Sequence, residues 1–408
     1  MKNNGKEKIK GRKTINVPLL RFIEFNDEWE KHKFEEIITN HSFKKYLAKP
    51  NNTGEYEVIQ QGDNPIVGLS NGIPFTNYHN IILFGDHTTS LYKPTKPFFI
   101  ATDGVKILSA DEMESNFLFA VLQRYNPGSQ GYKRHFTILK HQYAWINKNI
   151  EEQTKIGLLF KQLDDIVTLH QRNLNLLKSQ KQTLLSKVFP KDNEVYPEIR
   201  FKGFTDIWEQ ERFSDIFDLS VSNNTLSRSN LNYIKGEIKN IHYGDILVRY
   251  GSVVNVNDDI VPFVTDGKIE KYKCHLLKNG DVIIADTAED DTTGKVVEIN
   301  GINENYAIAG LHTIVARPIN NFARNYLGYY LNSESYHKQL VPLMQGIKVL
   351  SLNKANLSMT TISYPNDTRE QENIGIFFSQ IDSLINLYQR ELDVIKEMKK
   401  TLLKNMFV

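Results

Sequence analysis

The chain has 408 residues, a length that fits two or three domains better than one. Hydrophobic residues make up 40% and charged residues 24%, values that exclude disordered and fibrous classes of protein. The net charge is only +2 and Cys274 is the single cysteine. The single cysteine excludes an intramolecular disulfide and a cysteine-based zinc cluster. The small net charge argues against a protein that binds nucleic acid through charge alone.

The chain begins with a lysine-rich segment, which is followed by no apolar stretch. Six of the first 13 residues are lysine or arginine, a composition typical of a solvated, disordered tail, here predicted over residues 1–17. Neither a secretory signal nor a run of about 18 apolar residues occurs. We therefore expect a cytoplasmic protein that makes no membrane contact.

Residues 18–151 are predicted to form a mixed, strand-rich domain. Short β-type runs are broken by turn signals such as Gln-Gly-Asp and Thr-Asp-Gly. A short helix is expected after them. The predicted strands cover residues 56–59, 81–84 and 97–101, and the predicted helix covers residues 116–123.

Residues 152–190 predict a long helix with a heptad seam. Nine residues follow one another at alternating spacings of 3 and 4, the period of a coiled coil rather than of a helix that covers a globular core. A lysine occupies one seam position, where a polar residue fixes register at some cost in stability. The seam consists of Phe160, Leu163, Val167, His170, Leu174, Leu177, Lys181, Leu184 and Val188.

A linker over residues 191–196 leads to a second strand-rich domain, residues 197–369. Its β-type runs again lie next to Gly-Asp turns, and a helix again follows them. The predicted strands cover residues 245–250, 281–285, 295–299 and 312–317, and the predicted helix covers residues 325–331.

Residues 370–408 predict a second long helix whose seam repeats the first. We expect the two helices to pack as an antiparallel coiled coil within one chain. Two unrelated amphipathic helices on separate cores are the alternative. The second seam consists of Phe378, Ile381, Ile385, Tyr388, Leu392, Ile395, Lys399, Leu402 and Met406.

Two long-range repeats relate the halves of the chain. Residues 152–190 align without a gap onto residues 370–408, with 17 identities in 39 positions. Residues 18–37 match residues 197–216, including Arg21 with Arg200 and Trp29 with Trp208. The predicted fold is therefore α+β: two mixed domains separated by two long helices that form an antiparallel coiled coil, with a pseudo-two-fold internal repeat.

Sequence motifs of self-sufficient enzymes are missing. The chain contains no G-x-x-x-x-G-K-[ST], no G-x-G-x-x-G and no Asn/Asp-Pro-Pro-aromatic tetrad of adenine methyltransferases. One acidic cluster, residues 286–291 with Lys295 nearby, leaves a magnesium-dependent nuclease open as an alternative. A structural coiled-coil adaptor without DNA specificity is a further alternative.

Each half also carries a Gln-Gly-x-Lys signature after its predicted short helix, and basic or amide side chains cluster around it. Arginine and lysine can bind guanine or hold a phosphate. The candidate DNA-binding residues are Lys44, Lys45, Tyr46, Lys133, Arg134, His135, Arg228, Gln345 and Lys348.

The repeated Phe-x-x-Phe-x-Asp-x-Trp segments and the helices that open on Glu152-Gln153 and Glu370-Gln371 resemble the specificity subunit of type I restriction-modification systems. The likeness covers nearly all of residues 18–408, with one departure: the first half lacks the proline that the second has in Tyr364-Pro365.

The resemblance implies a noncatalytic subunit whose two domains each read one part of a bipartite DNA target. It also implies that the helices dock methylation subunits, and that restriction subunits join the complex. No cofactor is expected in this chain, whereas S-adenosylmethionine, ATP and magnesium are expected on the partner subunits.

Overall fold

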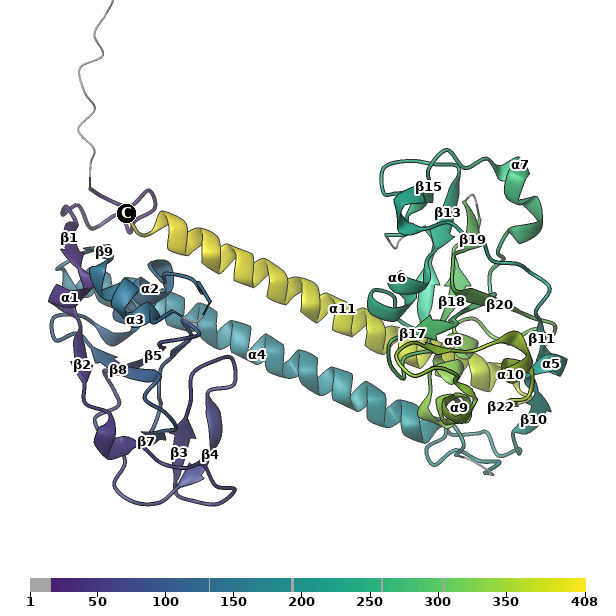
Figure 1. Ribbon diagram of the computed structural model, residues 1–408, viewed down its shortest axis with the longest axis horizontal. Coiled ribbons are helices and arrows are strands. Elements are labelled where there is room, and N and C mark those ends of the chain that lie inside the picture. The colour runs from purple at the N-terminus through teal and green to yellow at the C-terminus, as the bar shows by residue number, and fades with distance from the viewer. Residues whose placement is uncertain (1–15, 132, 192–193, 258–259, 304) are drawn as a thin grey trace, which may run out of the picture. The chain divides into compact units, whose positions relative to one another are not determined.

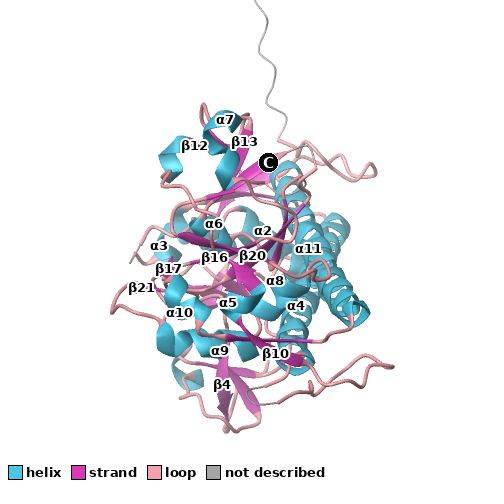
Figure 2. Ribbon diagram, turned by 90° about the vertical axis from the view of Figure 1, so that its right-hand side faces the viewer, coloured by secondary structure: helices cyan, strands magenta, loops and turns pink. Residues whose placement is uncertain are grey.

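The computed structural model describes residues 16–131, 133–191, 194–257, 260–303 and 305–408. The predicted tail therefore lies almost wholly outside the described residues. The chain divides into two compact units: unit 1 comprises Met1–Arg172 and Arg390–Val408, and unit 2 comprises Asn173–Gln389. Helices and strands build both units, as the α+β prediction requires (Figure 1, Figure 2). No helix within the described ranges is long and apolar enough to cross a bilayer.

The described residues of unit 1 form three small sheets, with strand orders β1-β9, β2-β8-β5-β6 and β4-β3-β7. Its elements are β1 (Glu30–Lys33), α1 (Phe34–Ile37), β2 (Thr39–His41), η1 (Lys44–Tyr46), β3 (Tyr56–Ile59), β4 (Ile66–Ser70), β5 (Ile82–Gly85), β6 (Leu91–Tyr92), β7 (Phe98–Ile100), β8 (Val105–Ser109), α2 (Ser115–Arg124), α3 (His135–His141), β9 (Tyr143–Ile146) and the first part of α4 (Ile150–Val188).

Unit 2 contains sheets with strand orders β10-β22, β11-β20-β16-β18-β14, β12-β15-β13-β19 and β17-β21. Its elements are β10 (Glu209–Arg212), α5 (Phe213–Ile216), β11 (Phe217–Asp218), η2 (Arg228–Asn230), β12 (Leu231–Asn232), β13 (Ile238–Ile241), α6 (Tyr243–Val248), β14 (Val253–Asn255), β15 (Phe263–Val264), α7 (Ile269–Tyr272), η3 (Lys273–His275), β16 (Val282–Ala285), β17 (Thr287–Ala288), β18 (Val296–Asn300), β19 (Tyr306–Ala309), β20 (Thr313–Pro318), α8 (Tyr326–Leu331), α9 (Glu334–Leu340), η4 (Val341–Leu343), β21 (Leu350–Ser351), α10 (Lys354–Ser358), β22 (Thr361–Tyr364) and part of α11 (Thr368–Asn405).

One predicted strand is wrong. Residues 245–250 were expected to form a strand because Ile246, Leu247 and Val248 make a short apolar run, but they lie largely in the helix α6. The His242 side chain caps this helix by accepting a hydrogen bond from the Gly244 amide, and a local side-chain cap of this kind outweighs a weak β propensity.

The long helices α4 and α11 pack antiparallel within each unit. In unit 1, Lys399 binds Asp164, and His170 lies 3.5 Å from Glu391. In unit 2, Lys181 binds Asp382 at 2.5 Å. Residue numbers rise along one helix as they fall along the other, which confirms the predicted antiparallel pairing. The predicted seam residues are the buried or half-buried positions of this pair.

The seam lysines are neutralised across the helix pair. Each lysine binds an aspartate of the opposite helix, and each aspartate also accepts a hydrogen bond from the short helix beside it: Gln123 of α2 donates to Asp164, and Tyr329 of α8 donates to Asp382 at 2.8 Å. Burial raises the pKa of Tyr329, and the Asp382 charge raises it further, so the phenol stays protonated as a donor. The lysines therefore fix register and join a short helix to the helix pair.

The two repeated sequence segments bind each other in both units. The Arg21 guanidinium makes two 2.7 Å hydrogen bonds with the Glu152 carboxylate, and Arg200 makes the matching pair with Glu370 at 2.7 and 2.8 Å. Both glutamates are buried, and a buried carboxylate requires a partner that satisfies it with hydrogen bonds, as the bidentate arginine does. This pair explains why an Arg-Phe segment and a Glu-Gln helix start occur together twice.

The missing proline of the first half leaves the helix start unchanged. Gln153 donates to the Asn147 carbonyl, and Gln371 donates to the Pro365 carbonyl at the matched position. A carbonyl accepts this hydrogen bond whether or not the residue is proline. The departure from the family pattern is therefore neutral at this contact.

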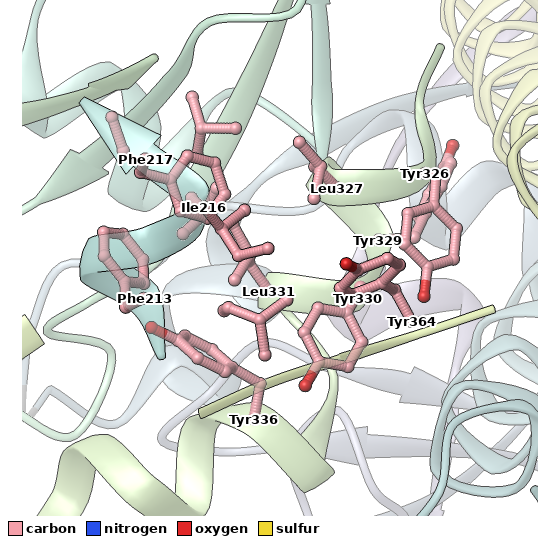
Figure 3. Packing of buried hydrophobic residues seen from close by; sticks show 14 of the residues in the cluster. Phe213, Ile216, Phe217, Tyr326, Leu327, Tyr329, Tyr330, Leu331, Tyr336 and Tyr364 are labelled. Atoms are coloured by element: carbon pink, nitrogen blue, oxygen red, sulfur yellow. The ribbon is translucent and has the colours of Figure 1, made fainter. Parts of the chain in front are cut away.

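The aromatic residue near the end of each long helix packs onto a buried tryptophan. Phe407 lies 5.6 Å from Trp29 in unit 1, and Phe189 lies 6.3 Å from Trp208 in unit 2. In unit 2 this contact borders a tyrosine-rich core contributed by α8, α5 and β22 (Figure 3). The repeated segments thus form the scaffold, and the residues between them fill two different cores.

Candidate nucleic-acid interface

The Gln-Gly-x-Lys loop of unit 1 is held by a buried histidine. The Gln130 amide donates to Nε2 of His135 at 2.8 Å, and Nδ1 of His135 lies 2.9 Å from the Asp86 carbonyl. The ring therefore carries its proton on Nδ1 and accepts at Nε2. Lys133 and Arg134 are exposed, and Lys133 donates to the Gln130 side chain at 3.2 Å.

The three neighbouring candidates of that loop, Lys133, Arg134 and His135, differ in exposure. Because His135 is fully buried, it positions the loop and is not part of the exposed basic surface. Lys133 and Arg134 remain candidates for contacts with DNA. Tyr132, between Gly131 and Lys133, lies outside the described residues.

The candidates Lys44, Lys45 and Tyr46 of unit 1 form the short helix η1. Lys44 and Lys45 are exposed there, whereas the Tyr46 ring packs edge-on against Phe75 at 5.0 Å. Tyr46 therefore anchors the segment to the core beneath it, and the two lysines are the members that face solvent.

The Gln-Gly-x-Lys loop of unit 2 is a tight turn. Gln345 exchanges backbone hydrogen bonds with Ser351 at 3.0 and 2.8 Å. Gly346 has φ +126°, and a Cβ there would lie 1.9 Å from the Val349 carbonyl oxygen, so only glycine fits. Gln345 and Lys348 are exposed at this turn, and Ile347 between them is fully exposed.

Arg228 belongs to a group of basic and aromatic side chains that the sequence did not reveal. Its guanidinium binds the buried Asp245 carboxylate at 2.7 and 2.9 Å and also donates to the Tyr233 hydroxyl. Arg249 donates to the same hydroxyl at 3.2 Å and lies over the Tyr233 ring. Two cations and one aromatic ring thus gather on this surface, a combination suited to phosphates and base edges.

The residues beneath this group are hydrogen-bonded as well. Burial lowers the pKa of His242, and the Arg228 charge lowers it further, which favours the neutral imidazole that accepts from the Gly244 amide. Tyr243 packs edge-on against His312 at 5.3 Å. The residues beneath Arg228 are therefore fixed by contacts of their own.

The acidic cluster at residues 286–291 forms a turn. Asp290 accepts hydrogen bonds from the amide and hydroxyl of Thr292, which lower the pKa of its carboxyl. Within the described ranges, no group of three or more His, Cys, Asp or Glu side chains is arranged to hold a metal ion. The geometry thus gives the nuclease alternative no support.

The chain was compared with known proteins. Residues 205–397 match the family model for the type I restriction modification DNA specificity domain. The type I restriction enzyme MjaVIII specificity subunit of Methanocaldococcus jannaschii is 21% identical over 264 residues, which cover 62% of this chain and 59% of that protein. The putative MjaX specificity subunit of the same organism is 24% identical over 204 residues, covering 49% of this chain and 45% of that protein.

The chain thus spans about half to three fifths of the length of these two relatives. Among solved structures, the S subunit of a type I restriction-modification system from M. genitalium has the same fold, with a TM-score of 0.64 and 15% identity over 96% of this chain and 99% of that one. These findings confirm the resemblance predicted from the repeated segments: residues 205–397 match the type I specificity-domain family model, and the chain has the fold of a type I restriction-modification S subunit.

Proposed function

We propose that the chain is the noncatalytic subunit that reads an asymmetric, bipartite DNA target for a type I restriction-modification complex. Each unit would read one half of the target through its exposed loops. The recognition domains would comprise residues 18–151 and 197–369, joined by the helices at 152–190 and 370–408. The proposed setting is the cytoplasm, where double-stranded DNA is accessible.

One observation carries this proposal. The same scaffold contacts occur in both units, whereas the exposed surfaces that they hold differ between the units. The Arg21 and Glu152 pair recurs as Arg200 and Glu370. Apart from the two Gln-Gly-x-Lys loops, the exposed candidate residues do not recur: unit 2 presents Arg228, Tyr233 and Arg249, whereas unit 1 presents Lys44, Lys45 and Arg134. Two different readers on one repeated frame suit a target whose halves differ.

Docking of methylation subunits is supported by apolar side chains that the seam does not use. Ile166 and Leu169 of α4 are 41% and 54% exposed, and their repeat partners in α11, Leu384 and Leu387, are 39% and 50% exposed. Exposed apolar groups retained at matched positions indicate a surface that a partner covers.

These side chains occupy matched heptad positions in the two long helices. With Phe160 and Phe378 as heptad position a, Ile166 and Leu384 occupy position g, and Leu169 and Leu387 occupy position c. Positions c and g are neighbours on the helix surface, so each pair forms one apolar patch on its own helix. The two apolar patches, Ile166 with Leu169 in unit 1 and Leu384 with Leu387 in unit 2, are each proposed to pack against helices of a methylation subunit.

The chemistry is proposed to reside on those partners. S-adenosylmethionine would bind the methylation subunits, and ATP and magnesium would act on the restriction subunits. This chain would supply the orientation of DNA relative to them. A coiled-coil adaptor without DNA specificity remains the competing function, and it predicts no influence of this chain on which sequence is modified.

The experiment is sequencing of methylated adenines in a host that carries the methylase gene with and without this gene. The proposal expects one bipartite methylated sequence that disappears when the gene is removed and returns with the intact chain. An identical methylation pattern in both hosts would favour the adaptor or nuclease function.

A further inference from the structure

A basic groove of about 890 Å³ lies in unit 1 between α2 and the last turns of α11. Five cationic side chains line it: Arg124 at the end of α2, and Lys396, Lys399, Lys400 and Lys404 of α11. Glu397 is the acidic residue among the lining side chains. The groove is therefore a site for an anion rather than for an apolar ligand.

Part of this positive charge is not neutralised. Lys399 binds Asp164, and Lys400 lies 3.4 Å from Glu397. Over the described part of the chain, no carboxylate forms an ion pair with Arg124, Lys396 or Lys404. Nε of Arg124 is also buried without a hydrogen-bond partner among the described residues. Three charges thus remain available to an external anion.

The lysines are spaced for an extended anion. Lys396, Lys400 and Lys404 follow one another at intervals of four residues, so they lie on one face of α11 over about 12 Å. One strand of duplex DNA presents a phosphate about every 3.4 Å along the axis, so this face covers about three or four phosphates. A compact anion would meet at most two neighbouring lysines and not the whole row.

The scaffold repeat carries one of these three lysines. The positions of α4 that match Lys396, Lys400 and Lys404 in the repeat are Lys178, Gln182 and Ser186. Lys400 and Lys404 are thus particular to the end of α11, and the row of three lysines does not recur in α4.

The groove also adjoins the candidate DNA-binding loop of unit 1. Arg124 and Asn126 line the groove, and the Asn126 side chain donates to the Thr89 carbonyl at 2.8 Å. From there the chain continues directly into the loop that carries Gln130 and Lys133. The groove and the loop are thus connected by residues 127–129 of the chain.

We propose that this groove holds the sugar-phosphate backbone of the duplex on which unit 1 acts, an inference that rests on the proposed function. Contacts of lysine and arginine with phosphates fix position and carry no sequence information. The groove therefore supplies affinity that is independent of sequence, and it leaves the methylated sequence unchanged.

The test uses the chain in complex with its methylation subunits. The triple variant K396Q/K400Q/K404Q is compared with K178Q/K202Q/K278Q, which removes the same charge from exposed lysines elsewhere. Binding to target and non-target duplexes is measured over a series of salt concentrations, and methylated sites are sequenced. Three lost phosphate contacts should lower the slope of log K against log salt by about 2 to 3 and weaken binding at low salt at least about tenfold.

The expected result is that the groove variant loses affinity equally for target and non-target DNA, whereas the control variant binds nearly as the wild type does. Equal binding by both triple variants would overturn the inference. So would an altered methylated sequence, which would make these lysines base readers, or failed assembly with the methylation subunits, which would make the groove a protein interface. If the wild-type complex itself prefers no sequence, the proposed function fails instead.

Discussion

The buried carboxyl of Glu298 joins β18 to the start of α8. It is buried on β18 and accepts hydrogen bonds from the amides of Asn325 and Gly328 at 2.6 and 2.9 Å. Burial raises its pKa from 4.5 to about 7, although these amide hydrogen bonds oppose the rise. The folded chain therefore holds a proton on Glu298 at a pH where the unfolded chain has released it.

The consequence is a falling stability between pH 4.5 and pH 7. Over this window the folded state binds more protons, so the free energy of unfolding decreases as pH rises, by roughly 3 kcal/mol if the full shift of pKa is expressed. In Glu298→Gln this loss should be absent, as measured by urea unfolding at pH 5 and pH 8. The exposed Glu372→Gln serves as the control and should keep it. The same loss in Glu298→Gln and wild type would contradict the assignment.

At the scale of single residues, the sequence indicated which residues are candidates for the interface better than it indicated what each of them does. Arg228 was a candidate because it lies in a Ser/Asn-rich loop, but its partners Asp245 and Tyr233 come from other segments. Arg249 was missed because residues 245–250 were assigned to a strand. His135 was grouped with Lys133 and Arg134 because they are adjacent in sequence, and adjacency does not reveal that the ring is buried against Asp86.

At the scale of elements, the heptad spacing predicted the helix pair well because burial in a coiled coil follows sequence periodicity directly. The seam lysines were expected to fix register, and the structure supplies their aspartate partners. The links to α2 and α8 could not be predicted. Gln123 and Tyr329 are brought to the aspartates by the tertiary packing of α2 and α8 beside the long helices, which sequence periodicity does not reveal.

The Lys181 and Asp382 pair should contribute more to stability than an exposed ion pair. Asp382→Ala leaves a partly buried lysine and the Tyr329 hydroxyl without their partner, and should cost about 2 kcal/mol in the free energy of unfolding. Asp165→Ala removes an exposed partner of Lys161 and should cost less than about 0.5 kcal/mol. Urea unfolding of both variants measures the two costs. Equal costs would show that the Lys181 and Asp382 pair contributes no more to stability than an exposed ion pair does.

The two apolar patches predict a separation of folding from assembly. Leu169→Lys and Leu387→Lys change side chains that are already half exposed, so the melting temperature should change little. Copurification with the methylation subunits should nevertheless fall strongly, because a charge would be buried at the contact. The control is Gln182→Lys, at an exposed position outside both patches. Normal assembly of the two leucine variants would place the docking surface elsewhere.

At the scale of the whole molecule, the internal repeat revealed the architecture before any strand was located. Matched positions such as Trp29 and Trp208 take matched places in the two cores. The basic groove was not foreseen, because α2 and the end of α11 are separated by more than two hundred residues of sequence. Surfaces assembled from distant segments require the tertiary fold, whereas repeats and periodicity do not.

The central claim is that each unit independently reads one half of a bipartite target. Residues 38–151 are exchanged for the same region of a related specificity subunit, while the Arg21 and Glu152 pair and both long helices are retained. Methylated sites are then sequenced in cells that carry the exchanged chain with the methylation subunits. One half of the methylated sequence should change to that of the donor, and the other half should remain as it was. A change in both halves, or in neither half of an active complex, would contradict the account.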